Sequence, residues 1–408
     1  MKEPIRKMEE ILARMSAIGE DEAGGLTRLL YDHSWKKAQE ALKQAFSQIG
    51  LESEYDQVGN LFGKARGTEK PDEIVLTGSH VDTVRNGGPL DGQYGILAGF
   101  LAVERLLEKY GPPKKTLMVV SFAEEEGSRF PYAFWGSKNL MGLADREDLR
   151  AAVDGQGVTF PQAMSQAGFD FEAVMPESIK NVAAFVEAHI EQGGVLERLN
   201  KQIGVVTAIA GQKRYTVTLT GEANHAGTTP MGMRRDAVEG MARCQVKLLD
   251  EAKKLGDPLV LTFGRVLPKP NVVNVVPGEV VFTIDTRHTD PQTLNAFGRQ
   301  VESVIVETAG ALSLDAHIDL WMDELPVPMD RNLTAQLENI CRKMNIGYQV
   351  MHSGAGHDSQ IIAPTFPTSM LFVPSIRGVS HNPAESTKMD DLVAGVDVLE
   401  AFLHELAY

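Results

Sequence analysis

Two apolar runs separated by a helical segment constrain the fold most strongly, because each run ends in side chains that can do chemistry. The run 73–80 (EIVLTGSH) ends at His80, and the run 116–127 (TLMVVSFAEEEG) ends in three glutamates. Between them, the turn-rich stretch 89–95 (PLDGQYG) leads into an apolar helical pattern over 96–111. This order predicts a largely parallel α/β sheet, and such sheets place ligands at the carboxyl ends of their strands.

The segments on either side of these runs complete the first part of the pattern. Residues 4–18 and 35–49 have the periodicity of amphipathic helices, and 53–66 alternates around Gly59-Asn60 like a hairpin. The stretch 181–198 (NVAAFVEAHIEQGGVLER) is compatible with either an amphipathic helix or a strand that passes into a helix. It contains His189.

The pattern changes from about residue 204, where β-rich runs alternate with two helical stretches near 235–255 and 291–310. Two helices on a four-stranded antiparallel sheet make a separate α+β unit. After about residue 328 the chain returns to helix, strand and helix. We therefore expect a discontinuous α/β domain, 1–210 with 328–408, interrupted by an inserted α+β domain, 211–327.

Composition excludes several classes of protein. The net charge of −15 opposes binding to nucleic acids or anionic membranes. The only cysteines, Cys244 and Cys341, lie in amphipathic patterns and are expected in the core, so no disulfide framework forms. The N-terminal segment lacks the apolar stretch of a signal peptide, and no apolar run approaches the length of a membrane span. We expect a cytoplasmic protein with neither a nucleic-acid nor a membrane partner.

Five side chains that commonly bind metals lie in short runs scattered along the chain. Imidazole and carboxylate ligands suit Zn²⁺, Mn²⁺ and Co²⁺ alike. A carboxylate in a glycine-rich loop approaches an ion easily and can bridge two ions through its two oxygens. The sequence therefore predicts a site for two divalent cations, made by His80, Asp91, Glu126, His189 and His381.

Two further carboxylates are expected beside these ligands. Asp82 follows His80 by two residues and is a candidate acceptor for the second ring N–H of that histidine. Glu125 and Glu126 are adjacent, so one can bind metal while the other faces the water as a general base. The alternative for three consecutive glutamates is a solvated run of charge.

The remaining histidines carry weaker signals, because a single histidine is more often a surface or core residue than a ligand. His33 and His404 fit that ordinary interpretation, and His317 lies in a strand-like run. His352 and His357 flank a glycine-rich loop that could line a pocket.

Eight short runs in order resemble the aminoacylase-like family of dinuclear metallohydrolases, and within it the amidase branch. That branch includes N-carbamoyl-L-amino-acid hydrolases, β-ureidopropionases and allantoate amidohydrolases, and the chain looks most like the last group. The resemblance covers nearly the whole chain and rests on GSHVDTV, LDGQYG, EEEGSRF, AHIEQG, NHAGTTPM, NVVP, GAGHDSQ and SHNPAE.

The resemblance implies a role for each candidate residue of the metal site. His80, Asp91 and His189 would hold one ion, and Asp91, Glu126 and His381 the other, with Asp91 bridging. Glu125 would be the catalytic base and Asp82 the partner of His80. The inserted domain would be a lid that also forms a homodimer.

The resemblance also implies residues that bind the substrate. His225 would reach the active site of the partner subunit, and its alternative is an ordinary turn residue. Arg287 and Asn274 would bind a carboxylate, although Arg287 could instead pair with Asp285 or Asp290. Arg214 would add positive potential, and less specific matches fall on Gln192, Gln212 and Gly356.

The expected activity is hydrolysis of the ureido C–N bond of a small anionic substrate, allantoate, which releases ammonia and CO₂ and leaves ureidoglycine. The nearest alternative is an N-carbamoyl-L-amino-acid hydrolase, and a dipeptidase or aminoacylase is a further one. An alternative of another class is a metabolite-binding protein without catalysis.

Overall fold

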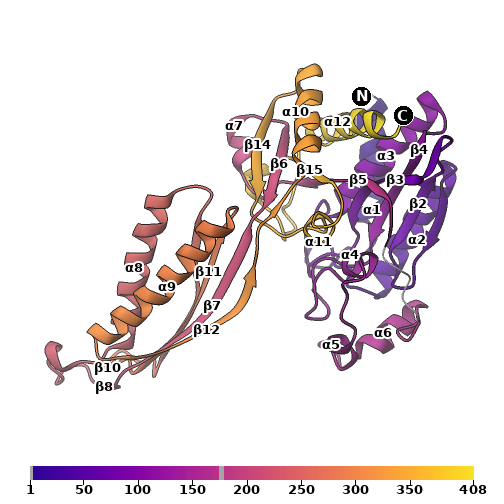
Figure 1. Cartoon of the computed structure of the whole chain (residues 1–408). Helices are drawn as coiled ribbons and strands as arrows, with labels where there is room; N and C mark the ends of the chain where they lie inside the picture. The colour runs from indigo at the N-terminus through magenta and orange to yellow at the C-terminus, as the bar shows by residue number, and fades with distance from the viewer. Residues whose placement is uncertain (1–2, 174–178) are drawn as a thin grey trace. The chain divides into compact units, whose positions relative to one another are not determined.

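The computed structural model describes residues 3–173 and 179–408, and it divides into two compact units (Figure 1). The first comprises Met1–Thr207 with Met329–Tyr408, and the second Ala208–Pro328. None of the described helices has both the length and the apolar character needed to cross a membrane.

A mixed sheet forms the centre of the first unit. Its four middle strands are parallel, in the order β4-β3-β5-β15, and antiparallel strands extend it on both sides. The strands in sheet order are β1 (Glu52–Tyr55), β2 (Leu61–Ala65), β4 (Lys115–Phe122), β3 (Lys70–His80), β5 (Val182–Ile190), β15 (Thr368–Val373), β6 (Ile203–Ile209) and β13 (Val327–Pro328), with β14 (Tyr348–Ser353) also paired to β6. The prediction of a largely parallel α/β domain is confirmed, and 181–198 forms a strand that passes into a short helix.

Helices cover this sheet because its parallel strands are apolar on both faces and must be buried on both. The two helices predicted near the N-terminus are α1 and α2. The helices of this unit are α1 (Glu3–Ser16), α2 (His33–Gln48), α3 (Gln93–Tyr110), α4 (Trp135–Leu140), α5 (Glu147–Arg150), α6 (Phe160–Ala167), α7 (Val195–Leu199), α10 (Arg331–Lys343), α11 (Ser359–Ile362) and α12 (Met389–Ala407), with a 3₁₀ turn, η2 (Ile376–Gly378).

The second unit is a four-stranded antiparallel sheet with two helices, as predicted. The sheet order is β12 (Asp315–Glu324), β7 (Gly211–Thr220), β11 (Glu279–His288) and β9 (Val260–Lys269). Buried residues alternate along β7 and β11, so one face of the sheet packs on α8 (Ala237–Leu255) and α9 (Pro291–Ala311). A separate strand pair joins β8 (Asn224–His225) to β10 (Val275–Val276), and a 3₁₀ turn, η1 (Met231–Met233), follows β8.

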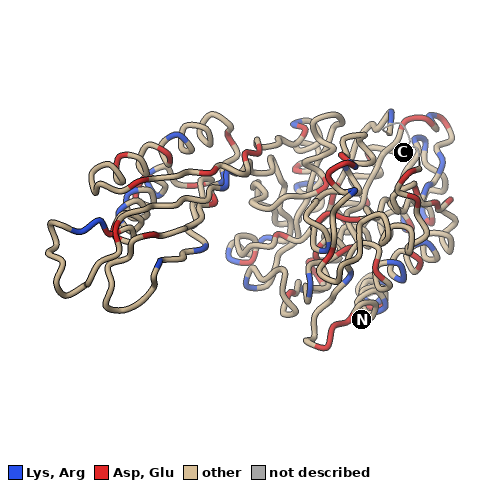
Figure 2. Tube along the Cα trace, turned by 90° about the horizontal axis from the view of Figure 1, so that it is seen from below, with Lys and Arg blue, Asp and Glu red and all other residues tan. Residues whose placement is uncertain are grey.

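Charged residues are spread over both units rather than gathered in one segment. Figure 2 shows acidic and basic residues interspersed along the trace. Cys244 in α8 and Cys341 in α10 are free and buried, which confirms the expectation that both belong to cores.

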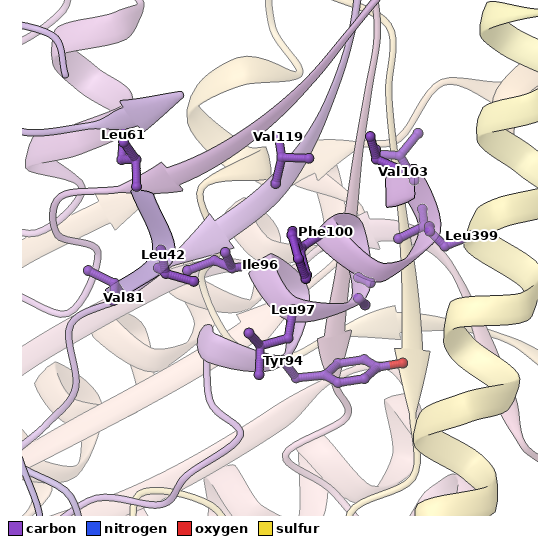
Figure 3. Packing of buried hydrophobic residues seen from close by; sticks show 14 of the residues in the cluster. Leu42, Leu61, Val81, Tyr94, Ile96, Leu97, Phe100, Val103, Val119 and Leu399 are labelled. Carbon is purple, nitrogen blue, oxygen red and sulfur yellow. The ribbon is translucent and has the colours of Figure 1, made fainter. Parts of the chain in front are cut away.

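Helix α3 is packed in the main hydrophobic core of the first unit. Its apolar side chains, among them Ile96, Leu97 and Phe100, are buried in the main core (Figure 3). At its start, the hydroxyl of Tyr94 donates a hydrogen bond of 2.9 Å to the carbonyl of Leu392 in α12. The first turn of α3 is therefore fixed in position, directly after the loop that contains Asp91.

Candidate metal centre

The five predicted ligands lie at one edge of the parallel strands. His80 is the last residue of β3 and His189 lies near the end of β5. Asp91, Glu126 and His381 follow β3, β4 and β15 in loops. Because these four strands are parallel neighbours, their carboxyl ends meet, and residues far apart in sequence converge there.

Asp91 lies between two groups of ligands, and each of its oxygens faces one group. Oδ1 is 3.6 Å from Nε2 of His80 and 3.2 Å from Nε2 of His189, whereas Oδ2 is 3.1 Å from Nε2 of His381. Nε2 of His381 is also 3.4 Å from Oε1 of Glu126. In each group the candidate ligand atoms lie within 4.8 Å of one another. This is the arrangement expected of a carboxylate that bridges two cations.

Contacts behind the ligands orient the two buried imidazoles. Nδ1 of His80 is 3.2 Å from Oδ1 of Asp82, and Nδ1 of His189 is 3.0 Å from the carbonyl of Ile190. A histidine that donates from Nδ1 presents the lone pair of Nε2 to a metal. The backbone N–H of Gly92 donates to Nε2 of His189, in agreement with that tautomer.

Asp82 also fixes the glutamate loop. Its Oδ1 accepts the backbone N–H of Glu125 at 3.0 Å, and its Oδ2 accepts that of Glu126 at 3.1 Å. One carboxylate therefore braces both a histidine ligand and the two adjacent glutamates.

The electrostatics of the site favour a bound cation. Burial raises the pKa of Asp91, but the adjacent imidazoles of His189, His381 and His80 outweigh burial and hold that pKa well below its usual range. Oε1 of Glu126 is buried and has no hydrogen-bond partner among the described residues. A buried carboxylate oxygen without a donor costs free energy unless a cation binds it, so these residues fit divalent metal ions.

The three glutamates after β4 are not a solvated run of charge. Glu124 is 2% exposed and Glu125 is 9% exposed. Burial raises the pKa of Glu125 well above its usual value against the opposing charge of His80, and the carboxylates of Glu126 and Asp358 raise it further. Glu125 thus lies beside the ligands as a carboxylate with an increased affinity for a proton.

Residues near the ligands show contacts that the sequence did not indicate. Nε2 of Gln192 donates to Oδ2 of Asp91 at 2.8 Å. His357 is buried, with its ring centroid 4.6 Å from that of His189. At Gly356, a Cβ would lie 2.9 Å from Oε1 of Gln360, so the backbone approaches its neighbours closely there.

The candidate residues of the second unit fall into two groups. His225 and Asn274 lie on or beside the short β8–β10 pair and are exposed. Nδ1 of His225 accepts the backbone N–H groups of Gly227 and Thr228, at 3.0 and 3.2 Å. In the neutral ring the proton is therefore on Nε2, which makes that atom a donor.

The other group lies on β7 and β11. Nε of Arg214 is 2.8 Å from Oδ2 of Asp285, and Nε of Arg287 is 2.9 Å from Oδ1 of the same carboxylate. Arg287 thus makes one of the ion pairs considered from the sequence. Gln212 is the cross-strand partner of Arg287, and its buried Oε1 has no hydrogen-bond partner among the described residues.

Comparison with known proteins identifies the family. Residues 76–405 match the profile of peptidase family M20/M25/M40. The chain belongs to this family. Membership in peptidase family M20/M25/M40 places the chain among the hydrolases and agrees with the two ligand groups that share Asp91.

The chain is also similar over its whole length to individual proteins of known name. It is 53% identical over 401 residues to the allantoate amidohydrolase of Escherichia coli (strain K12), covering 98% of each chain. It is 45% identical over 408 residues to that of Bacillus subtilis (strain 168), covering 100% of this chain and 98% of the relative. The crystal structure of an amidase of the hydantoinase/carbamoylase family from Burkholderia multivorans matches with a TM-score of 0.94, at 31% identity, over 99% and 98% of the two chains.

Proposed function

We propose that the chain is a metal-dependent hydrolase of allantoate that breaks a ureido C–N bond and releases ammonia, CO₂ and ureidoglycine. The observation that carries this proposal is the pair of ligand groups sharing Asp91, with the buried Glu125 beside them. The similarity to two allantoate amidohydrolases supports allantoate as the substrate.

The proposed cofactors are two divalent ions per chain. His80, Asp91 and His189 would hold one, and Asp91, Glu126 and His381 would hold the other. The donor set suits Zn²⁺ or Mn²⁺, and also Co²⁺. When bound, such ions would supply Lewis-acid chemistry, which polarises a carbonyl and activates water.

Glu125 is the proposed general base. A ureido carbonyl is a weak electrophile because two nitrogens donate electrons into it, so water must lose a proton as it attacks. The Glu125 carboxylate takes that proton and passes it to the leaving nitrogen. Its raised pKa suits the first task, because a carboxylate with a raised pKa takes up a proton more readily. Asp82 positions it through the backbone.

The second unit is proposed to act as a lid and as the surface through which two chains form a homodimer. His225 then donates from Nε2 to the developing oxyanion in the site of the partner subunit. The hydrogen bonds accepted by Nδ1 support that role, because they direct the proton of the neutral ring to Nε2. A well-aimed donor of this kind typically stabilises the transition state by roughly 3–4 kcal/mol.

Arg287 and Asn274 are proposed to bind the substrate carboxylate. A guanidinium group binds a planar carboxylate through two parallel hydrogen bonds, which favours arginine for this task. Arg214 is proposed to add positive potential, and the further proposed substrate-binding residues are Gln212, Gln192 and Gly356, together with His225.

A substrate panel with metal-reconstituted protein tests this proposal. Metal-free protein is loaded with Mn²⁺ or Zn²⁺, and turnover is measured on allantoate, on N-carbamoyl-L-amino acids and on dipeptides, with Glu125→Gln as the control. The expected result is ammonia release from allantoate at a kcat/KM higher than for any other compound. A higher kcat/KM for N-carbamoyl-L-amino acids would show that these compounds, and not allantoate, are the substrate. Tight binding of allantoate without turnover would indicate a binding protein.

A further inference from the structure

Glu385 is a buried carboxylate that connects the two loops containing Asp91 and His381. It is the last residue of the SHNPAE run, and it is 4% exposed. Its Oε1 accepts the backbone N–H of Leu90 at 2.8 Å and that of Asp91 at 3.1 Å. The backbone of the bridging ligand is therefore bound to a side chain from the opposite end of the chain.

The side chain of Ser380 also connects Glu385 with Asp91. Its hydroxyl oxygen lies 2.8 Å from Oε2 of Glu385 and 3.1 Å from Oδ2 of Asp91, so its single proton can be donated to either carboxylate. Because Ser380 immediately precedes His381, this contact fixes the backbone next to a ligand.

Gly88 provides the space that this arrangement needs. A Cβ at this position would lie 2.2 Å from both Cδ and Oε1 of Glu385. These atoms cannot approach so closely, and any side chain at position 88 would displace the carboxylate from the two N–H groups. The loop before Asp91 and the side chain of Glu385 are thus fitted to each other.

His381 depends on such support more than the other two histidine ligands do. Its side chain is 49% exposed, whereas those of His80 and His189 are 2% and 1% exposed. Its backbone has a φ of 54°, a left-handed conformation that costs free energy for a residue with a Cβ. Tertiary contacts must hold such a residue in place.

We propose that Glu385 is a positioning residue that joins the loops of Asp91 and His381 and so preorganises the Asp91–Glu126–His381 group for its ion. The inference rests on the proposed two-ion site, but not on the identity of the substrate. Glu385 acts through Asp91 and His381, and it neither binds the ion nor contacts the substrate.

Calorimetric titration of Mn²⁺ or Zn²⁺ into metal-free protein tests this role. In Glu385→Ala, the affinity for one ion should fall about 10–100-fold, the usual effect of removing a group that orients a metal ligand. The affinity for the other ion, held also by the buried His80 and His189, should fall much less. In Glu385→Gln the amide oxygen still accepts the two N–H groups, so both ions should bind with nearly normal affinity.

Two further variants separate positioning from general stability. Gly88→Ala retains every ionisable group and should reproduce the selective loss, even if Glu385→Ala fails to fold. Asp236→Ala is the matched control, because Asp236 also accepts two backbone N–H groups, at 2.9 and 3.1 Å, but at the start of α8 in the second unit. It should lower the melting temperature and leave both metal affinities unchanged.

The outcomes are distinct. Normal binding of both ions in Glu385→Ala and Gly88→Ala, or equal weakening of both ions, would refute the positioning role. If wild-type protein binds two ions and the variants lose one selectively while allantoate is not hydrolysed, the positioning role stands and the proposed substrate fails.

Discussion

The candidate residues of the two units differ in how they are held. In the first unit, four of the five candidate ligands have side chains no more than 8% exposed, and they lie at or just beyond the carboxyl ends of buried parallel strands. In the second unit, His225 and Asn274 are exposed beside a two-residue strand pair. A metal site must hold its ligands in place before the ion arrives, whereas residues that recognise a substrate can remain solvated until it binds.

The largest expected effect comes from the residue shared by both ligand groups. Asp91→Ala removes the carboxylate common to both, so both ions should bind weakly and ammonia release from allantoate should fall to the uncatalysed background. Elemental analysis after gel filtration, together with an ammonia assay, measures this. Retention of two ions with normal turnover would show that Asp91 does not bridge them.

Glu125→Gln should separate chemistry from metal binding. The amide cannot take a proton, so kcat should fall by about 10²–10⁴-fold. Both ions should remain, because Glu125 belongs to neither ligand group. Metal content and kcat are measured on the same sample, and normal turnover would remove Glu125 from the mechanism.

His225→Ala tests the second unit. Loss of an oxyanion donor should lower kcat by about 10²–10³-fold and leave the metal content unchanged. Mixing His225→Ala with Glu125→Gln under conditions that exchange subunits should restore activity, because one site of each mixed dimer then has both groups. If mixing restores nothing although subunits exchange, His225 does not act in the partner's site.

The smallest expected effect is on stability and concerns Asp285. Burial raises its pKa, but Arg287 and Arg214 outweigh burial, so the folded-state pKa lies below the usual value. Its stabilising contribution is therefore complete above the unfolded pKa and is lost as the pH falls through the folded pKa. Asp285→Asn should cost about 0–1 kcal/mol at neutral pH, and the difference from wild type should shrink on acidification.

Denaturation with urea at a series of pH values measures this difference. A stability difference that stayed constant down to the lowest pH would show that the two arginines do not stabilise the Asp285 carboxylate.

The sequence predicted the sheet from local patterns, whereas the two candidate ligand groups followed from the resemblance to a known family. Apolar runs ending in His80 and the glutamates required parallel strands, and parallel strands bring their ends together. Contacts between distant segments left no local pattern. Glu385 accepts a hydrogen bond from the backbone of Leu90, which is 295 residues away in the sequence. The ring of His357, in the segment between β14 and α11, packs on the ring of His189 in β5. The pairing of Arg214 with Asp285 depends on the register of β7 against β11, which the sequence left open.

The most direct test of the account is a titration of metal-free protein with Mn²⁺ in which bound ions per chain and ammonia release from allantoate are measured together. Hydrolysis should appear as the second ion binds, and Asp91→Ala should bind both ions weakly and show no hydrolysis above the background. Full activity with one ion per chain, or two bound ions without any hydrolysis of allantoate, would contradict the account.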